Sequence, residues 1–180
     1  MRQLLKFIIA LGVAVVLMLL FRALVFTIYT VDGTALMPYL HQGDRILVNR
    51  WSYGLRTGNN AGLFEYGRLL KTDVQRGDII AVENPNDSIS GIYICRCQFV
   101  PGDTISHNGG KLVVPGLFNC ANEDCYWLES LNPSVPLDSR VFGFVGESRI
   151  IGRVCMVVYN HNDSQPFYTG YDKNRFLLVK

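Results

Sequence analysis

The sequence predicts a mainly β protein, an antiparallel sandwich or barrel-like domain behind one N-terminal transmembrane helix. Two observations favour this fold. A long apolar run opens the chain, and after it come many short β-branched runs that Gly, Pro, Asn and Asp residues interrupt. No long stretch after the apolar run has a helical period. Many short strands without helices between them are typical of antiparallel sheets.

The composition fits one membrane anchor joined to one folded domain. The chain has 180 residues, of which 49% are hydrophobic and 18% are charged, and its mean hydropathy is +0.17. These values are too apolar for a purely soluble domain and too polar for a protein with several membrane spans. The net charge of +2 and the lack of a Lys/Arg run argue against nucleic acid as a partner.

The predicted anchor is the apolar run Phe7–Phe21, which Arg2 and Lys6 precede. Its length is close to the lower limit for crossing a bilayer. A cleavable signal sequence begins in the same way, but no small-residue cleavage site follows this run. We therefore interpret residues 1–22 as the cytoplasmic N-terminus and anchor, and residues 23–180 as the folded domain. Basic residues at the short N-terminal end favour a single-pass protein of the inner (cell) membrane with an extracytoplasmic domain.

The folded domain is expected to consist of short strands. A β-rich segment, 23–31, leads into it, and seven further strands are predicted at Arg45–Trp51, Ile79–Val82, Ile92–Val100, Lys111–Val114, Val141–Val145, Ile150–Val158 and Phe176–Val179. Turn residues such as Asn84-Pro85 separate these runs. No internal repeat is present, so one domain is the economical reading.

One stretch, Val31–Asp44, stands out from the rest of the chain and reads VDGTALMPYLHQGD. Gly33 permits backbone conformations that other residues avoid, and Pro38 fixes its own φ and restrains the residue before it. Gly43 and Asp44 read as a turn into the following strand. The stretch therefore predicts a shaped, half-apolar loop close to the membrane surface.

This loop resembles the active-site box of the type I signal peptidases, membrane-anchored serine proteases whose box reads roughly G-x-S-M-x-P-T-L and is followed by G-D and a strand. Three further segments resemble that family's boxes in the same order: Gln75–Ile80; Tyr93–Arg96 with Pro101–Ile105; and Asp138–Arg140 with Phe142-Gly143, Val145 and Ile151–Arg153. A single short match would carry little weight. Four matches in order behind one anchor identify the chain as a member of the family.

The resemblance implies a β-sheet domain that binds the extended end of a signal peptide as an added strand, without a metal or cofactor. In the family a serine attacks the peptide bond, and a buried neutral lysine removes its proton. The matching positions place Gly33, Thr34, Met37 and Pro38 in the substrate groove and oxyanion region. Arg96, Asp138, Ser139 and Arg140 match a motif that mainly holds the family's domain together.

Both positions of that catalytic pair are substituted in this chain. Ala35 stands where the family has its serine, and Cys95 stands where it has its lysine. A methyl group cannot attack a carbonyl, and a thiol is not the base that the mechanism requires. Pro136 also stands where a serine that orients the lysine is usual. These substitutions predict a catalytically inactive family member that binds signal-type or other extended peptides, or a partner such as an active paralogue.

The alternative is a working signal peptidase. Ala35 would then be an engineered replacement of a serine, or a substitute nucleophile such as Cys95 would act. Thr34 is a weaker substitute, because neighbouring residues of an extended segment point to opposite faces. The three histidines, His41, His107 and His161, lie in turn-like polar contexts, so we expect exposed loop residues and no paired base for Cys95.

Five cysteines are present, at positions 95, 97, 120, 125 and 155, and an odd number leaves at least one unpaired. In an oxidising compartment a Cys120–Cys125 disulfide is favoured, and the other three are expected to be small buried residues. A four-thiolate zinc site is the competing interpretation. The spacing Cys95-x-Cys97 suits a strand better than a zinc knuckle.

Overall fold

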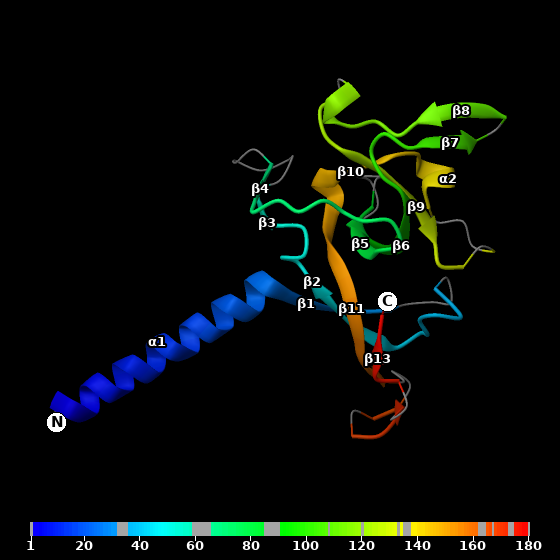
Figure 1. Ribbon diagram of the computed structural model, residues 1–180. Helices are drawn as coiled ribbons and strands as arrows, with labels where there is room; N and C mark the ends of the chain where they lie inside the picture. The colour runs from blue at the N-terminus through cyan, green and yellow to red at the C-terminus, as the bar shows by residue number, and fades with distance from the viewer. Residues whose placement is uncertain are drawn as a thin grey trace.

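The computed structural model of the protein describes residues 2–31, 36–58, 66–84, 91–107, 109–119, 121–132, 134, 138–161, 165–166, 168–172 and 175–179 (Figure 1). In chain order its elements are α1 (Arg2–Val25), β1 (Phe26–Thr30), β2 (Asp44–Asn49), β3 (Leu55–Thr57), β4 (Gly67–Leu69), β5 (Ile79–Glu83), β6 (Ile92–Phe99), β7 (Thr104–His107), β8 (Gly110–Val113), η1 (Leu117–Asn119), β9 (Cys125–Ser130), α2 (Ser139–Phe142), β10 (Val145–Gly146), η2 (Glu147–Arg149), β11 (Ile150–His161), β12 (Tyr171–Asp172) and β13 (Leu177–Leu178).

The predicted mainly β, antiparallel class is confirmed. One sheet runs in the order β1-β2-β11-β5-β6-β9-β10, and β12 and β13 pair with β11 beside this path. All of these pairings are antiparallel. The sheet curls, and the small hairpins β3–β4 and β7–β8 flank it (Figure 1).

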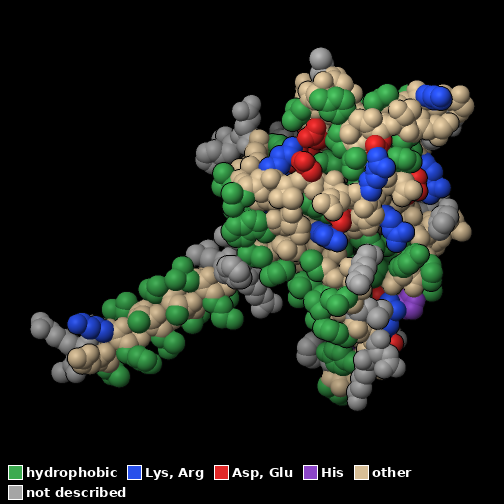
Figure 2. All heavy atoms as spheres, in the orientation of Figure 1, with side chains coloured by type: hydrophobic (Ala, Val, Ile, Leu, Met, Phe, Trp, Pro, Cys, Tyr) green, Lys and Arg blue, Asp and Glu red, His purple; other side chains and the backbone are tan. Residues whose placement is uncertain are grey.

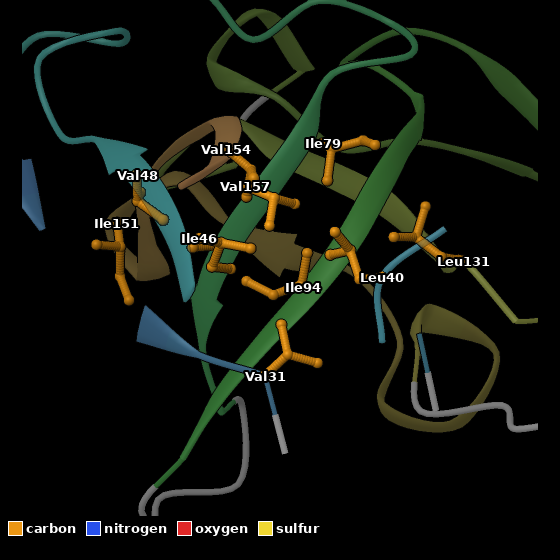
Figure 3. Close-up of a cluster of buried hydrophobic side chains, with 11 residues drawn as sticks. Val31, Leu40, Ile46, Val48, Ile79, Ile94, Leu131, Ile151, Val154 and Val157 are labelled. Carbon is orange, nitrogen blue, oxygen red and sulfur yellow. The ribbon is translucent and has the colours of Figure 1, made fainter. Parts of the chain in front are cut away.

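The strands alternate their buried side chains between two apolar clusters on opposite faces of the sheet. On β5, Ile79 and Ala81 join one cluster, and Ile80 and Val82 join the other. The first cluster, called cluster A here, also contains Val31, Leu40, Ile46, Val48, Ile94, Leu131, Ile151, Val154 and Val157 (Figure 3). The second, cluster B, contains Tyr53, Val74, Cys95, Cys97, Tyr126, Leu128, Val145 and Ile150. Successive side chains of a strand point to opposite faces. Because both faces of the sheet are buried at β5, its first four residues are all apolar and only Glu83 at its end is charged.

Helix α1 extends away from the sheet and contacts it only near its C-terminal end (Figure 1). Its sequence is rich in Leu and contains several Ala, which favour helices, and it contains no proline. Except for Val25 at its C-terminal end, which is buried, the described large apolar side chains along α1 are exposed, among them Phe7 at 67% and Leu19 at 57% (Figure 2). Within the described residues, no helix is both long enough and apolar enough to cross a membrane.

Two local predictions are wrong. The segment predicted as a strand at Val141–Val145 begins as the short helix α2, because the Asp138 carboxylate caps it by accepting a hydrogen bond from the Arg140 backbone N–H. Only Val145 and Gly146 then pair as a strand, with β9. The helical end also replaces the predicted β segment at residues 23–25, because α1 continues to Val25.

Candidate functional site

The candidate site begins at the described part of the predicted loop, residues 36–44. The positions Gly33, Thr34 and Ala35 lie outside the described residues. The peptide bond between Met37 and Pro38 is cis, and the Leu40 N–H donates to the Leu36 carbonyl at 3.1 Å. This turn buries Leu40 in cluster A and leaves Met37 and Tyr39 exposed at 40% and 54%. Apolar and aromatic side chains are therefore presented outward at this loop.

The far end of the loop is held by the buried carboxylate of Asp44. Its Oδ2 accepts the His41 backbone N–H at 2.8 Å, and its Oδ1 accepts the Asn160 side-chain amide at 2.8 Å. Arg175, near the end of the chain, donates to Oδ2 at 2.5 Å. Burial alone would raise the pKa of Asp44, but these hydrogen bonds outweigh it and hold the pKa below its usual range.

The second predicted position, Cys95, lies in the middle of β6. Its cross-strand neighbours are Ile80 on β5 and Ser130 on β9. Its side chain is 1% exposed and packs in cluster B. Burial and, to a smaller extent, the Asp138 carboxylate raise the pKa of this thiol to about 12. The thiol is therefore protonated at neutral pH.

Within the part of the chain that the structure describes, the N-terminal half of strand β6 has one backbone edge without a pairing strand. Ile92, Tyr93 and Ile94 pair with β5 on one side, whereas β9 pairs with β6 only from Cys95 onwards among the described residues. Strand β1 likewise pairs with β2 alone in the described sheet. Val31, which follows β1, and Ile94 both belong to cluster A (Figure 3). Two free strand edges thus border one apolar cluster.

Arg96 connects β6 to the loop. Its guanidinium lies 5.3 Å from the centre of the Tyr39 ring, a distance at which a cation and an aromatic face attract each other. Adjacent residues on a strand point to opposite faces. Arg96 therefore lies on the loop side of β6, together with Ile94, whereas Cys95 points to the other side.

Three of the four residues of the predicted structural motif, Asp138, Ser139 and Arg140, form a hydrogen-bonded cluster against β9. The buried Asp138 carboxylate accepts from the Arg140 side chain at 2.6 Å and from the Ser130 backbone N–H at 2.9 Å. The Ser139 hydroxyl accepts the Leu128 backbone N–H at 2.9 Å. These bonds fix the start of α2 against β9. Pro136 lies outside the described residues.

The prediction that the histidines are exposed loop residues is wrong at two positions, His161 and His107. His161 ends β11 and is buried, with its ring 4.9 Å from the Tyr171 ring. His107 lies in β7, not in a loop. Only His41 lies in the expected turn-like context.

None of the described cysteines, Cys95, Cys97, Cys125 and Cys155, forms a disulfide. The predicted Cys120–Cys125 disulfide is therefore wrong, because Cys125 keeps its thiol; Cys120 itself lies outside the described residues. Cys95 and Cys97 are buried as expected. Cys155 differs, because it is only partly buried.

Sequence reasoning missed Arg175 and Asn160, the two side chains that hold Asp44. Neither lies in a segment that resembles a family box. The sequence contains one indication, an aspartate, Asp44, directly after the turn residue Gly43. No sequence pattern identifies the residues that hydrogen-bond to this aspartate.

The curled antiparallel sheet, with a Met-Pro loop, an R-G-D segment before β5 and a P-G-D segment after β6, is consistent with the domain of a signal peptidase-type protein. The chain belongs to the signal peptidase family, peptidase S26, whose family model matches residues 4–119.

Curated relatives agree with this family. Signal peptidase I of Bacillus licheniformis is 33% identical over 107 residues, which cover 59% of this chain and 48% of the relative. Signal peptidase I T of Bacillus subtilis (strain 168) is 27% identical over 181 residues, 86% of this chain and 84% of the relative. Signal peptidase IB of Staphylococcus aureus (strain Mu50 / ATCC 700699) is 24% identical over 188 residues, 85% of this chain and 88% of the relative. The match thus spans about half the length of the first relative and most of the other two.

Proposed function

We propose that this chain is a signal peptidase-family protein that binds an extended, signal-type peptide and does not cleave it. The observation that carries the proposal is the state of Cys95. This thiol occupies the position of the family's lysine, and burial raises its pKa to about 12. A protonated thiol cannot remove a proton from a nucleophile, and Ala35 provides no hydroxyl that could be activated.

The orientation of Cys95 supports the same proposal. Its side chain packs in cluster B, whereas Leu36 of the loop packs against cluster A on the opposite face. Reactive cysteines are normally at least partly exposed to solvent. The Cys95 side chain is buried, so it is poorly placed to act as a substitute nucleophile.

The peptide-binding part of the proposal rests on the free edges of β1 and β6. An extended peptide can add to such an edge through backbone hydrogen bonds, and neighbouring apolar residues then select its side chains. Three apolar or aromatic side chains are exposed nearby in the chain: Met37 and Tyr39 on the loop that follows β1, and Ile92 at the start of β6. They favour a peptide with apolar residues, as signal peptides have.

We also propose that α1 anchors the chain in the inner membrane with the domain outside the cytoplasm. Among the described residues, α1 does not qualify as a membrane-spanning helix. The proposal therefore rests on the sequence of the segment Leu4–Phe21, in which Lys6 is the only charged residue. The exposed apolar side chains of α1 support it, because water would solvate them poorly. Lipid is the environment that such a surface requires.

A second candidate function is cleavage of signal peptides, which the names of the curated relatives favour. The experiment that separates the two candidates incubates a precursor with small residues at its cleavage site with four proteins. These are the unmodified chain, Ala35→Ser, Cys95→Lys and the double variant. We expect no specific cleavage by the first three, since members of a catalytic pair act as a unit and losing either costs nearly as much as losing both.

Specific cleavage by the unmodified chain would contradict the proposal, and its loss in Cys95→Ala would identify Cys95 as the nucleophile. Binding is tested separately with a photo-crosslinker at Met37 and, as a control, at Val113, which is exposed on the β7–β8 hairpin. A signal-type peptide should label the first position more strongly. Equal labelling at both positions would argue against a groove.

A further inference from the structure

The buried carboxylate of Asp44 brings three separate parts of the chain together. It accepts hydrogen bonds from the loop itself through the His41 N–H, from β11 through Asn160 and from the C-terminal tail through Arg175. Its side chain is fully buried, and that of Arg175 is nearly so. A buried ion pair contributes to stability only when further hydrogen bonds satisfy both charges, as they do here.

The C-terminal tail presents Arg175 from two anchored ends. Before it, β12 pairs with β11 through Tyr171↔His161 and Asp172↔Asn160. After it, β13 pairs with β11 at Leu177 and Leu178, and the Val179 N–H donates to the Cys155 carbonyl at 3.0 Å. Arg175 lies between these two pairings, so the tail cannot shift without breaking backbone hydrogen bonds.

Arg175 also reaches the exposed part of the loop. The same terminal nitrogen that donates to Asp44 lies 3.5 Å from the Tyr39 carbonyl. One guanidinium therefore contacts both the middle and the end of the segment 36–44. At Gly43, which has φ +85°, a side chain would meet the His161 carbonyl, so the loop also lies directly against β11.

We propose that Arg175 is a positioning residue for the peptide groove: it holds the segment Leu36–Asp44 in its binding shape through Asp44 and the Tyr39 carbonyl. This inference rests on the proposed peptide-binding function. The C-terminal tail thus acts as a strap, and a bound peptide would meet a loop whose shape depends on residues at the other end of the chain.

The experiment measures amide hydrogen exchange by mass spectrometry in the full chain, held in lipid nanodiscs. Arg175→Gln removes the charge and keeps a hydrogen-bond donor. Its control is Arg76→Gln, which removes the partner of Asp103 in an exposed ion pair outside the groove. We expect exchange in peptides covering 36–44 to rise at least about tenfold in Arg175→Gln, the effect of losing a charge-assisted hydrogen bond. Exchange in β5 and β6 should stay unchanged, as should exchange of the loop in the control.

A second comparison tests the pairing itself. Asp44→Asn with Arg175→Gln removes both charges, so the double variant should exchange less in the loop than the sum of the two single effects predicts. Arg175→Lys should give a smaller increase than Arg175→Gln, because one ammonium can still contact the carboxylate. No change in the loop, or an equal rise throughout the sheet, would overturn the proposal.

Peptide affinity tests whether the contacts of Arg175 with the loop matter for the proposed peptide binding. A labelled signal-type peptide should bind Arg175→Gln at least about fivefold more weakly than the unmodified chain, at a temperature where both are folded. Equal affinity together with a loosened loop would overturn the positioning role. If the unmodified chain binds no peptide, the proposed function fails, and the exchange result still decides whether Arg175 holds the loop.

Discussion

Replacing Cys95 by lysine tests whether this site can still accept the neutral base that the family uses. The Cys95 side chain is 1% exposed, and burial is the main cause that raises its pKa to about 12. The same burial disfavours the charged form of a lysine and therefore lowers its pKa, while the nearby Asp138 carboxylate partly opposes this. A net lowering is expected, because burial has the larger effect on Cys95.

The cost in stability has two parts. Lysine is longer than cysteine by roughly three heavy atoms, and over-packing a core typically costs about 1–3 kcal/mol. If the lysine pKa falls by about one to two units, the charge costs a further ~1.4 kcal/mol per unit at neutral pH. The free energy of unfolding of Cys95→Lys should therefore lie about 2–6 kcal/mol below that of the parent at pH 7.

The pH dependence of the free energy of unfolding shows whether a lowered lysine pKa causes the loss of stability. Between its lowered folded pKa and the unfolded value near ~10.4, the lysine binds more protons in the unfolded state, so the stability of Cys95→Lys rises with pH. In the parent, the thiol pKa is raised in the folded state, so the stability that Cys95 contributes is lost above its unfolded value of about 8.5. Both effects make the difference in free energy of unfolding between the parent and Cys95→Lys smaller at pH 10 than at pH 7.

Urea unfolding at several pH values, followed by tryptophan fluorescence, measures this difference. Cys155→Lys, at a partly exposed position of β11, is the matched control and should cost little at any pH. A difference that is constant or widens with pH would show that the new ammonium stays charged, in water or paired with Asp138. A lysine in that state could not act as a base, and the reasoning from burial would be refuted.

Three further predictions follow from the described contacts. Asp138→Ala should lower the free energy of unfolding by about 3–5 kcal/mol, because Arg140 and the Ser130 N–H lose their buried acceptor, and Asp138→Asn should cost clearly less; equal losses in urea unfolding would contradict this. The pKa of Asp44 is held below its usual value, so its contribution is present above about pH 4 and is lost as the pH falls through the folded pKa; Asp44→Asn should flatten this acid-induced loss, and an unchanged slope would argue against it. Protease added outside intact spheroplasts should digest the domain beyond Thr27, whereas full protection would rule out an extracytoplasmic domain.

Several strands could be predicted from the sequence because turn residues bound a run of β-branched residues, whereas β3, β4, β7 and β9 were not predicted. The strand expected at Ile79–Val82 extends one residue further, to Glu83, and the one expected at Ile92–Val100 ends at Phe99. Asn84 and Pro101 stop these runs in the sequence. The segment after Asp138 defeated the same reasoning, because a single capping carboxylate overrides the weak strand preference of a short apolar run.

The candidate site was only partly predictable, because some of the residues that form it are far apart in the sequence. The pattern around Met37 and Pro38 is local, so the loop could be recognised from neighbouring residues. The hydrogen bond between Arg175 and Asp44 joins residues 131 positions apart, and no local pattern marks such a pair. The burial of His161 was missed for the same reason, since it depends on the ring of Tyr171 in a later strand.

The central place of β11 has a consequence for how the chain acquires its structure during synthesis. Among the described pairings, β11 alone joins β1 and β2 to β5, β6, β9 and β10, and it begins only at Ile150. Until this strand has left the ribosome, the two halves of the sheet cannot be joined by backbone hydrogen bonds through β11. Such non-local pairing folds slowly and exposes unpaired strand edges in the meantime. The growing domain should therefore depend on chaperones until β11 has emerged, whereas a sheet built from successive hairpins would not.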